Sequence, residues 1–461
     1  MFLMHEVPQT IQLNPAIGYR CKNYFILPLL SSMKFSFNST SIGYNNIFRV
    51  SPNNGNKTYQ YDFDQIAANL KNRNYIMTNI SFPVFGMGYE WKDHYLHFEI
   101  NNYTRLRLSF PDDLVALKDG NWNIADNNAK TLDLSGMGGM AMNYTSIGFG
   151  ISTEINEGTR LGARVEYLRG AANFSSRQTR LHLITTDNPI TLESSANLYY
   201  AMSFPMEVGL NDDGYISSYD FSPAGSNILK NYLFNKNWGF AIDLGFVKKI
   251  NQSITISGSL LDVGFIRWAS NINGLQSRGD FFYEGINLEE LIQNPYGMDY
   301  LSELRDTITR VFRLTPREDP YTVYLPLQSF VGIEYSFTNT LYCGIVLNNQ
   351  FFDSRLHTSA TAQLIYRYAD KISFSLSNTY MNHQFLNPGF GLVAGKNPVQ
   401  FYFMTDRLPV QYSRETSTGI IFPYRSRSFS FRFGITVCLG CEEKFRGRRR
   451  STRVKYCPAY H

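Results

Sequence analysis

The histidines, acidic pairs and clustered glycines of this chain do not form a familiar catalytic motif. His94 and His97 are three residues apart in a strand-like segment, which places them on opposite faces and makes them a poor metal pair. The sequence contains no G-x-S-x-G, H-E-x-x-H or P-loop motif, and Gly136–Gly139 lacks the strand-then-helix context of a dinucleotide site. The pair Asp112–Asp113 lies in a loop-like stretch, where solvation explains it. We therefore expect a protein that is not an enzyme, with no catalytic residue, no metal and no cofactor.

The five cysteines do not predict a disulfide framework. They are Cys21, Cys343, Cys438, Cys441 and Cys457, and their odd number leaves at least one unpaired. Cys438 and Cys441 form a single C-x-x-C without a second pair or a nearby histidine, which is a weak zinc signal. We expect these thiols to serve packing or to be incidental.

Six charged side chains fall on the small or polar face of segments that alternate between apolar and polar residues. If these segments are strands of a barrel, that face points into the lumen. The mixed signs then predict a lumen closed by ion pairs or holding a plug, in place of a wide channel with charges of one sign. Two interpretations stay open, since the charges either line a substrate path or only neutralise one another. The six lumen-lining candidates are Arg164, Glu166, Asp243, Asp262, Glu334 and Arg367.

The clearest of the alternating segments is 143–168. Ile147, Phe149 and Ile151 alternate with small or polar residues, the chain turns at Asn156–Gly158, and the alternation resumes from Leu161. A period of two on both sides of a tight turn that contains glycine predicts a β-hairpin. Similar hairpins recur without a fixed period at 76–108, 238–265, 330–351, 359–380 and 389–404, with single strands at 22–38 and 429–439.

The lengths of these strands favour a membrane barrel among the all-β folds. Many exceed the roughly 5–6 residues of sandwich strands and reach the ~9–11 residues of a strand that crosses a bilayer. Short turns at one end and long loops at the other are typical of an antiparallel transmembrane β-barrel with its short turns in the periplasm. We predict about 14 strands, within a range of 12 to 16, and short helices in the extracellular loops. The uncertain pair at 180–204 is assigned to an extracellular extension.

Composition and charge agree with a single barrel domain over residues 1–440. Only 18% of the residues are charged and 15% are aromatic, and no run reaches the ~18–20 apolar residues of a membrane helix. No signal peptide pattern is visible in Met1–Thr10. The net charge of +5 resides in 441–461, which we interpret as a basic periplasmic tail. The remaining body is neutral, which argues against nucleic acid as a partner.

Two loop regions have helical patterns. Phe63, Ile66 and Leu70 share one face after a capping aspartate at 62 or 64. The longest loop, 268–324, contains a capping-box pattern at Asn287 and Glu290 and an apolar stripe from Leu301 to Phe312. A helix there would pack on the barrel rim, enter its mouth or bind a partner.

Four stretches carry a resemblance to a known family: EVPQTIQLNPAIGYR, FILPLLSS, the segment 144–174 and the closing RFGITVCLG. They resemble an uncharacterised family of outer-membrane β-barrel proteins of the Bacteroidota. That family is distantly similar to FadL-type fatty-acid transporters and to barrel components of the type IX secretion system. The resemblance implies a location in the bacterial outer membrane, in contact with outer-membrane lipid.

The resemblance leaves two functions open. The first is a FadL-like conduit for a hydrophobic or amphipathic small molecule. The second is a non-transporting barrel that acts as a scaffold or partner of a secretion or surface complex. In the second case, a protein partner would bind the loop 268–324 or the tail 441–461.

Overall fold

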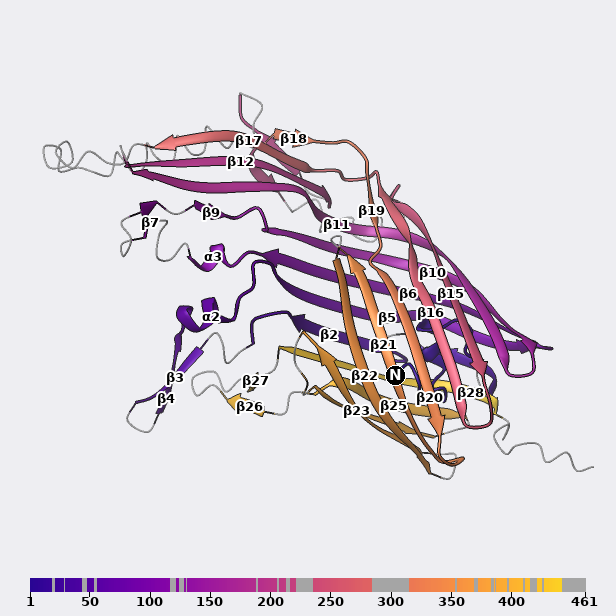
Figure 1. Cartoon of the computed structure of the whole chain (residues 1–461). Helices are drawn as coiled ribbons and strands as arrows, with labels where there is room; N and C mark the ends of the chain where they lie inside the picture. The colour runs from indigo at the N-terminus through magenta and orange to yellow at the C-terminus, as the bar shows by residue number, and fades with distance from the viewer. Residues whose placement is uncertain are drawn as a thin grey trace, which may run out of the picture.

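The chain folds into a closed antiparallel barrel in a computed structural model (Figure 1). The structure describes residues 1–18, 21–28, 30–43, 48–53, 56–116, 122–123, 128–129, 131–187, 190–204, 207–212, 216–220, 235–283, 315–352, 355–368, 372–382, 385, 387–395, 398–408, 411–414, 421–424 and 427–441.

Fourteen strands form the wall, as predicted. The first position is shared by β1 (Cys21–Ile26) and β2 (Met33–Ser39). The others, in order around the ring, are β5 (Asn74–Trp91), β6 (His94–Phe110), β10 (Gly138–Asn156), β11 (Thr159–Asp187), β15 (Trp238–Lys249), β16 (Ile254–Trp268), β20 (Leu327–Ser336), β21 (Leu341–Phe352), β22 (Arg355–Tyr368), β23 (Ile372–Met381), β24 (Pro388–Ala394), β25 (Val399–Arg407) and β28 (Ser428–Cys441). Each pairs with the next, and β28 closes the ring on β1 and β2.

The seam between the first and last strands differs from the prediction in two respects. The expected single strand 22–38 is interrupted at 27–32, and both of its halves pair with β28 on one side and β5 on the other. Cys21 and Cys441 lie opposite each other and form a disulfide, so the expectation that the cysteines serve packing or are incidental is wrong for this pair. The sequence interpretation did not take ring closure into account. Ring closure brings together two cysteines that are 420 residues apart in sequence.

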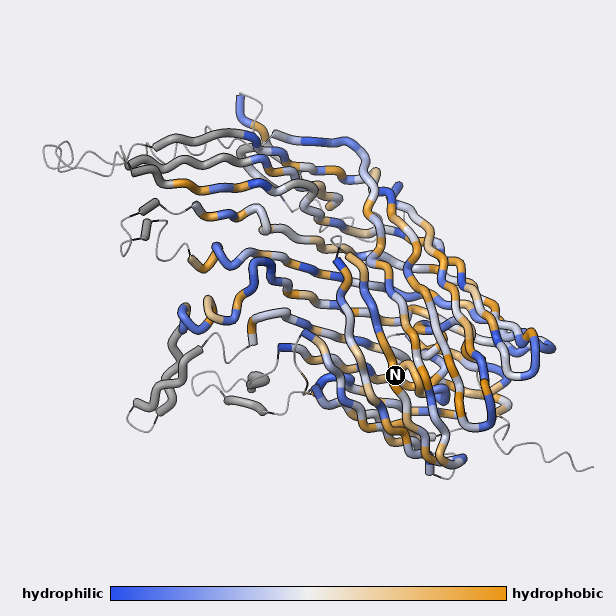
Figure 2. Tube along the Cα trace, in the orientation of Figure 1, coloured by the Kyte–Doolittle hydropathy of each residue, from blue (hydrophilic) through white to orange (hydrophobic). Residues whose placement is uncertain are grey.

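The outer face of the wall is apolar and the inner face is mixed, because side chains alternate along each strand. On β15, Phe240, Ile242 and Leu244 are exposed, whereas Ala241 and Asp243 are buried. The same alternation on the other strands produces a belt of exposed large hydrophobic side chains around the barrel. Figure 2 shows hydrophobic residues recurring along the wall and hydrophilic residues at the short turns at the lower right.

At the opposite end, several strands continue beyond the ring. β11 has 29 residues, and its second half pairs with β12 (Ile190–Ser203), which pairs in turn with β17 (Gly274–Tyr283). The pair predicted at 180–204 is therefore an extension and not part of the wall. Short strands at the same end are β9 (Thr131–Asp133), β18 (Thr315–Arg317) and β19 (Tyr321–Tyr324), which pair with β11, β17 and β16 respectively.

After the first eighteen residues, the other small elements of the described chain are four hairpins and two α-helices. The hairpins are β3 (Phe48–Asn53) with β4 (Asn56–Tyr61), β7 (Trp122–Asn123) with β8 (Asn128–Ala129), β13 (Glu207–Leu210) with β14 (Ile216–Asp220), and β26 (Gln411–Arg414) with β27 (Ile421–Tyr424). The predicted helix near Phe63 is α2 (Phe63–Asn69), capped by Asp62, which accepts a hydrogen bond from the Gln65 backbone N–H at 3.0 Å. The other is α3 (Asp113–Ala116).

Two predicted features lie outside the described residues. These are the helix between Asn287 and Phe312 and the basic tail, of which only Cys441 is described, as the last residue of β28. Within the described part of the chain, no helix has the length and apolar character needed to cross a membrane.

Candidate functional site

The first eighteen residues form a compact plug inside the barrel. We call Met1–Gly18 the plug. It contains one short 3-10 helix, η1 (Pro8–Gln12), and consecutive turns closed by backbone hydrogen bonds such as Val7 N–H to Met4 O at 3.1 Å. Proline at the start of η1 needs no hydrogen-bond acceptor for its nitrogen, which suits this position. Met4, Gln9 and Asn14 are completely buried, so the plug is enclosed by the wall.

The apolar side chains of the plug pack against the inner wall. Phe2 stacks on Phe330 of β20 with ring centroids 5.3 Å apart. Leu3, Met4 and Val7 belong to the same buried cluster, which includes wall residues from β16, β20, β21, β22, β24 and β25. This hydrophobic contact covers one side of the lumen.

On the other side, wall glycines allow the plug backbone to lie directly against the strands. A Cβ atom on Gly162 would come within 2.3 Å of the Pro15 carbonyl, and one on Gly245 within 2.1 Å of Asn14 Oδ1. Neither position can carry a larger side chain while the plug stays in place. The small residues on the inward face of β11 and β15 are thus the seat of the plug.

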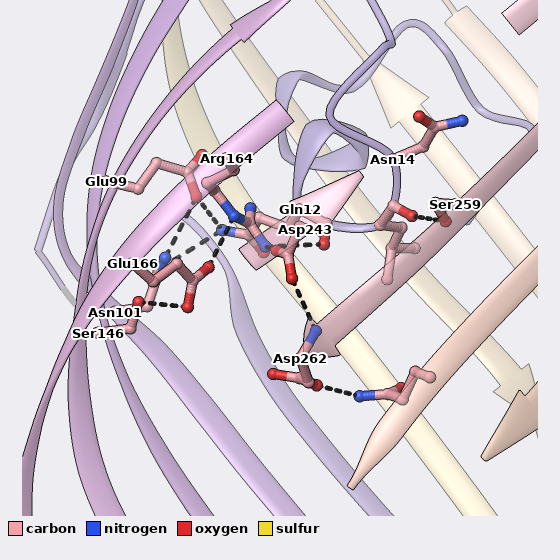
Figure 3. A network of polar contacts seen from close by, with 12 residues as sticks. Gln12, Asn14, Glu99, Asn101, Ser146, Arg164, Glu166, Asp243, Ser259 and Asp262 are labelled. Atoms are coloured by element: carbon pink, nitrogen blue, oxygen red, sulfur yellow. Dashed lines mark hydrogen bonds and ion pairs between the residues drawn. The ribbon is translucent and has the colours of Figure 1, made fainter. Parts of the chain in front are cut away.

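Four of the six predicted lumenal charges meet in one network (Figure 3). Arg164 forms ion pairs with Glu166, at 2.7 Å from Nε to Oε1, and with Asp243. Asp243 also accepts a hydrogen bond from the Asp262 backbone N–H at 2.7 Å. Arg164 donates to the plug backbone at Gln12 O, 3.4 Å away, so the network touches the plug directly.

The fourth charge, Asp262, connects this network to β6 and β20. Its backbone adopts a left-handed conformation with φ of 62°, at a bulge in the β15–β16 ladder. Its carboxylate accepts hydrogen bonds from Arg105 Nη2 at 2.9 Å and from Gln328 Nε2 at 2.6 Å. An aspartate tolerates this conformation better than most residues.

The other two predicted charges hold the first turn of the plug. Arg367 pairs with Glu6, and both side chains are buried. Glu334 lies 3.4 Å from the His5 Nε2 atom. A polar side chain of the plug also contacts the wall: Gln9 donates hydrogen bonds to Ser31 O at 2.9 Å and to Thr436 Oγ1 at 2.7 Å. All six predicted side chains therefore contact either the plug or the network that supports it.

Two adjoining cavities lie beside the plug, which contributes to the lining of each. They have volumes of about 100 and 180 Å³. Leu13 lines both cavities, and Met1 and Phe2 line the larger one. Polar and apolar side chains line them together, including Lys34, Met77, Asn79, Gln328, Gln350 and Arg432 in both.

The sequence interpretation missed three groups of residues at this site. It did not assign the plug residues Glu6, Gln9 and Gln12, nor Glu99, which accepts a hydrogen bond from Gln12 at 3.1 Å. It also missed Arg105 and the cations Lys34 and Arg432. The signal for Arg432 was present, because Phe431 and Phe433 alternate with it and face outward.

The described side chains contain no group of three or more His, Cys, Asp or Glu residues placed to hold a metal ion. The lumenal carboxylates instead meet guanidinium, amide and hydroxyl donors. This chemistry is suited to positioning the plug and to binding polar groups.

Comparison with known proteins gives one family and several barrels. Residues 15–406 match the model described as "Family of unknown function (DUF5723)". No curated protein matches the chain in sequence. Among solved structures, the Ralstonia pickettii toluene transporter TbuX is similar with a TM-score of 0.42 and 11% identity, over 94% of both chains. A Pseudomonas aeruginosa FadL homologue gives a TM-score of 0.42 and 10% identity over 95% of both chains.

Proposed function

The chain belongs to this family of unknown function, and we propose that it is a bacterial outer-membrane barrel that takes up a small amphipathic molecule, with the plug as its gate. The observation that carries the proposal is the arrangement of the lumen. The plug fills it at one level, and cavities with mixed polar and apolar walls adjoin the plug.

The outer face supports a membrane location. A belt of exposed Phe, Ile, Leu and Val side chains surrounds the barrel, and such a surface is stable only against lipid or another apolar phase. Trp91 and Tyr368, at the ends of β5 and β22, are exposed on the outside, as aromatic residues are in an interfacial girdle. Trp268, at the end of β16, is fully buried and does not belong to a girdle.

The disulfide supports an oxidising compartment. Disulfides persist in the periplasm and at the cell surface, and they are rare in the reducing cytosol. The Cys21–Cys441 bond lies at the end of the barrel that carries the short turns, where β1 begins and β28 ends. Because the short turns of outer-membrane barrels face the periplasm, we assign this end to the periplasm.

The lumen supports an amphipathic ligand over a purely hydrophobic one. Phe2, Phe330 and Val346 give the larger cavity an apolar side, while Asn348, Arg407 and other polar groups line the rest. A hydrocarbon in this cavity would leave polar groups without hydrogen-bond partners, which costs free energy. A molecule with both polar and apolar parts satisfies both sides.

Transport requires the plug to shift, because its residues span the lumen between Arg367 and Ser259. The test measures uptake of radiolabelled hexyl β-D-glucoside into proteoliposomes. We expect the full chain to exceed empty liposomes, and a variant lacking residues 2–13 to exceed the full chain several-fold. Asp212→Asn, on an exposed loop, serves as the control and should match the full chain.

Equal flux for the full chain, the shortened variant and empty liposomes would refute the conduit. Folding of the shortened variant is checked independently, by the change in its gel migration on heating. If the shortened variant is folded but does not take up the glucoside, the plug is not the cause of low flux.

A second candidate is a non-transporting barrel that holds a protein partner. The observation that favours it is the sheet of β11, β12 and β17, which projects beyond the ring and contains part of the predicted loop 268–324 as β17. The tail 441–461 is a further candidate contact. Affinity purification from native membranes tests this function, and recovery of the barrel alone would contradict it.

A further inference from the structure

Three cations from the strands at the seam project into the larger cavity. They are Lys34 on β2, Arg432 on β28 and Arg407 at the end of β25. Lys34 and Arg432 are cross-strand partners, and Arg407 is opposite Ser430, two residues from Arg432. A bulge in β25 between Met404 and Arg407 adjusts the register there. The fold thus concentrates positive charge on one side of the cavity.

These cations are poorly neutralised by the protein. Asp406 is the carboxylate that interacts electrostatically with Lys34, whereas Arg432, Arg407 and Arg105 repel it. Within the described part of the chain, none of the three cations lies within 4.0 Å of a carboxylate oxygen. Asp406 also interacts electrostatically with Arg407 and Arg432, so three cations share this one carboxylate. Cations that face a cavity in excess over carboxylates are able to bind an anion from solution.

The hydrogen bonds of the two guanidinium groups point to the same conclusion. Arg432 Nη1 donates to the Met1 thioether at 2.7 Å, and Arg407 Nη1 donates to the Met381 thioether at 3.6 Å. A thioether sulfur is a weak acceptor, whereas carboxylate and phosphate oxygens accept in a bidentate manner from arginine. An incoming oxyanion would therefore replace weak contacts with strong ones.

The surroundings of the cations limit what is attached to that oxyanion. Hydroxyl and amide side chains line the same cavity: Ser36, Asn38, Asn79, Asn348, Gln350 and Ser430. These groups donate and accept hydrogen bonds, so they match hydroxyl groups on a ligand and not a hydrocarbon chain. The volume of about 180 Å³ exceeds the roughly 150 Å³ of an engineered cavity that binds benzene, so a six-membered ring has room.

We propose that Lys34, Arg407 and Arg432 form a binding site for an oxyanion carried by a hydroxylated ring, such as a carboxylated sugar. The oxyanion bridges the three cations, and the ring hydroxyl groups meet the amide and hydroxyl side chains. This proposal rests on the proposed function, because it identifies the polar part of the amphipathic ligand. It adds a charge and a ring that the proposed function does not require.

The experiment compares three ligands on the purified full chain in a neutral polyoxyethylene detergent, by isothermal titration calorimetry. Hexyl β-D-glucuronide and hexyl β-D-glucoside share a tail and a ring and differ in the carboxylate. Hexanoate has the carboxylate but no ring. We expect the glucuronide to bind about tenfold more tightly than either, the scale of one charge-assisted hydrogen bond.

The variants Lys34→Gln, Arg407→Gln and Arg432→Gln should each weaken binding of the glucuronide and leave binding of the glucoside unchanged. Lys248→Gln removes a charge from an exposed position on β15 and should change the affinity for neither the glucuronide nor the glucoside. Retained binding of the glucoside shows that each variant is folded. Added salt should weaken binding of the glucuronide more than binding of the glucoside, because the additional interaction of the glucuronide is ionic.

The outcomes separate this proposal from the proposed function. Equal affinity for the glucuronide and the glucoside overturns the oxyanion site while uptake of an amphipathic molecule stands. Equal affinity for hexanoate and the glucuronide overturns the role of the ring. Absence of binding by all three ligands contradicts both proposals.

Discussion

The two sides of the lumen contain similar numbers of charged side chains but differ in how these side chains are paired within the protein. Around Arg164, each charge has a partner within the protein: Glu166 and Asp243 neutralise the guanidinium, and Asp262 pairs with Arg105. At the seam, Lys34, Arg407 and Arg432 face a cavity with Asp406 as the nearby carboxylate. The charges on the Arg164 side are neutralised within the protein, whereas the positive charges at the seam are only partly neutralised.

This difference teaches which lumenal charges serve structure. Buried ions are stable only when paired, and a pair that loses one member leaves an uncompensated charge. The Arg164 side satisfies that condition and also contacts the plug, so we propose that it stabilises the closed barrel. The seam cations line the cavity in which we propose that an oxyanion binds.

Substitution of Arg164 gives the largest expected effect and tests the structural side directly. Arg164→Gln leaves Glu166 and Asp243 buried without their cation, since all three side chains are nearly inaccessible to solvent. We expect the free energy of unfolding to fall by about 3–5 kcal/mol. Urea unfolding of the purified barrel in lipid vesicles measures the change. An unchanged midpoint would show that the two sides do not differ in this way.

Removal of the disulfide gives the next largest effect and tests the seam. The Cys21→Ser/Cys441→Ser variant should lose about 2–4 kcal/mol in the same unfolding assay. The seam strands also carry the repelling cations, so adding Arg432→Gln should recover part of this loss at low salt. Cys343→Ser, which removes a free and half-buried thiol, is the matched control. If Cys343→Ser lowers the free energy of unfolding as much as the double variant does, the loss comes from thiol packing and not from the disulfide.

Substitution of Lys34 gives the smallest expected change in stability and completes the comparison. Lys34→Gln removes one of three like charges and breaks no ion pair within the described chain. The free energy of unfolding should change by no more than about 0.5 kcal/mol. A loss as large as that of Arg164→Gln, measured under identical conditions, would mean that the seam cations are structural as well.

The sequence predicted the wall well because alternation and turns are local signals. The hairpin at Asn156–Gly158 and the inward face of Arg164 and Glu166 follow from a period of two, which the structure reproduces. The count of fourteen strands followed from the short turns. These features depend on neighbours within a few residues.

The plug and the seam were not predictable in the same way, because they depend on contacts between distant residues. Nothing near Glu6 indicates that its partner is Arg367, and the pairing of Cys21 with Cys441 requires the ring to be closed first. The bulge that places Asp262 beside Arg105 also has no local signal. Alternation indicates that a side chain points inward, but not what lies across the lumen.

The position of the disulfide has a mechanical consequence. Cys21 is the first residue of β1, and the plug precedes it in the chain. A force that pulls the plug out of the barrel is therefore transmitted to a covalent bond with the last strand, before it reaches the hydrogen bonds of β1. The disulfide therefore opposes separation of β1 from β28 under such a force.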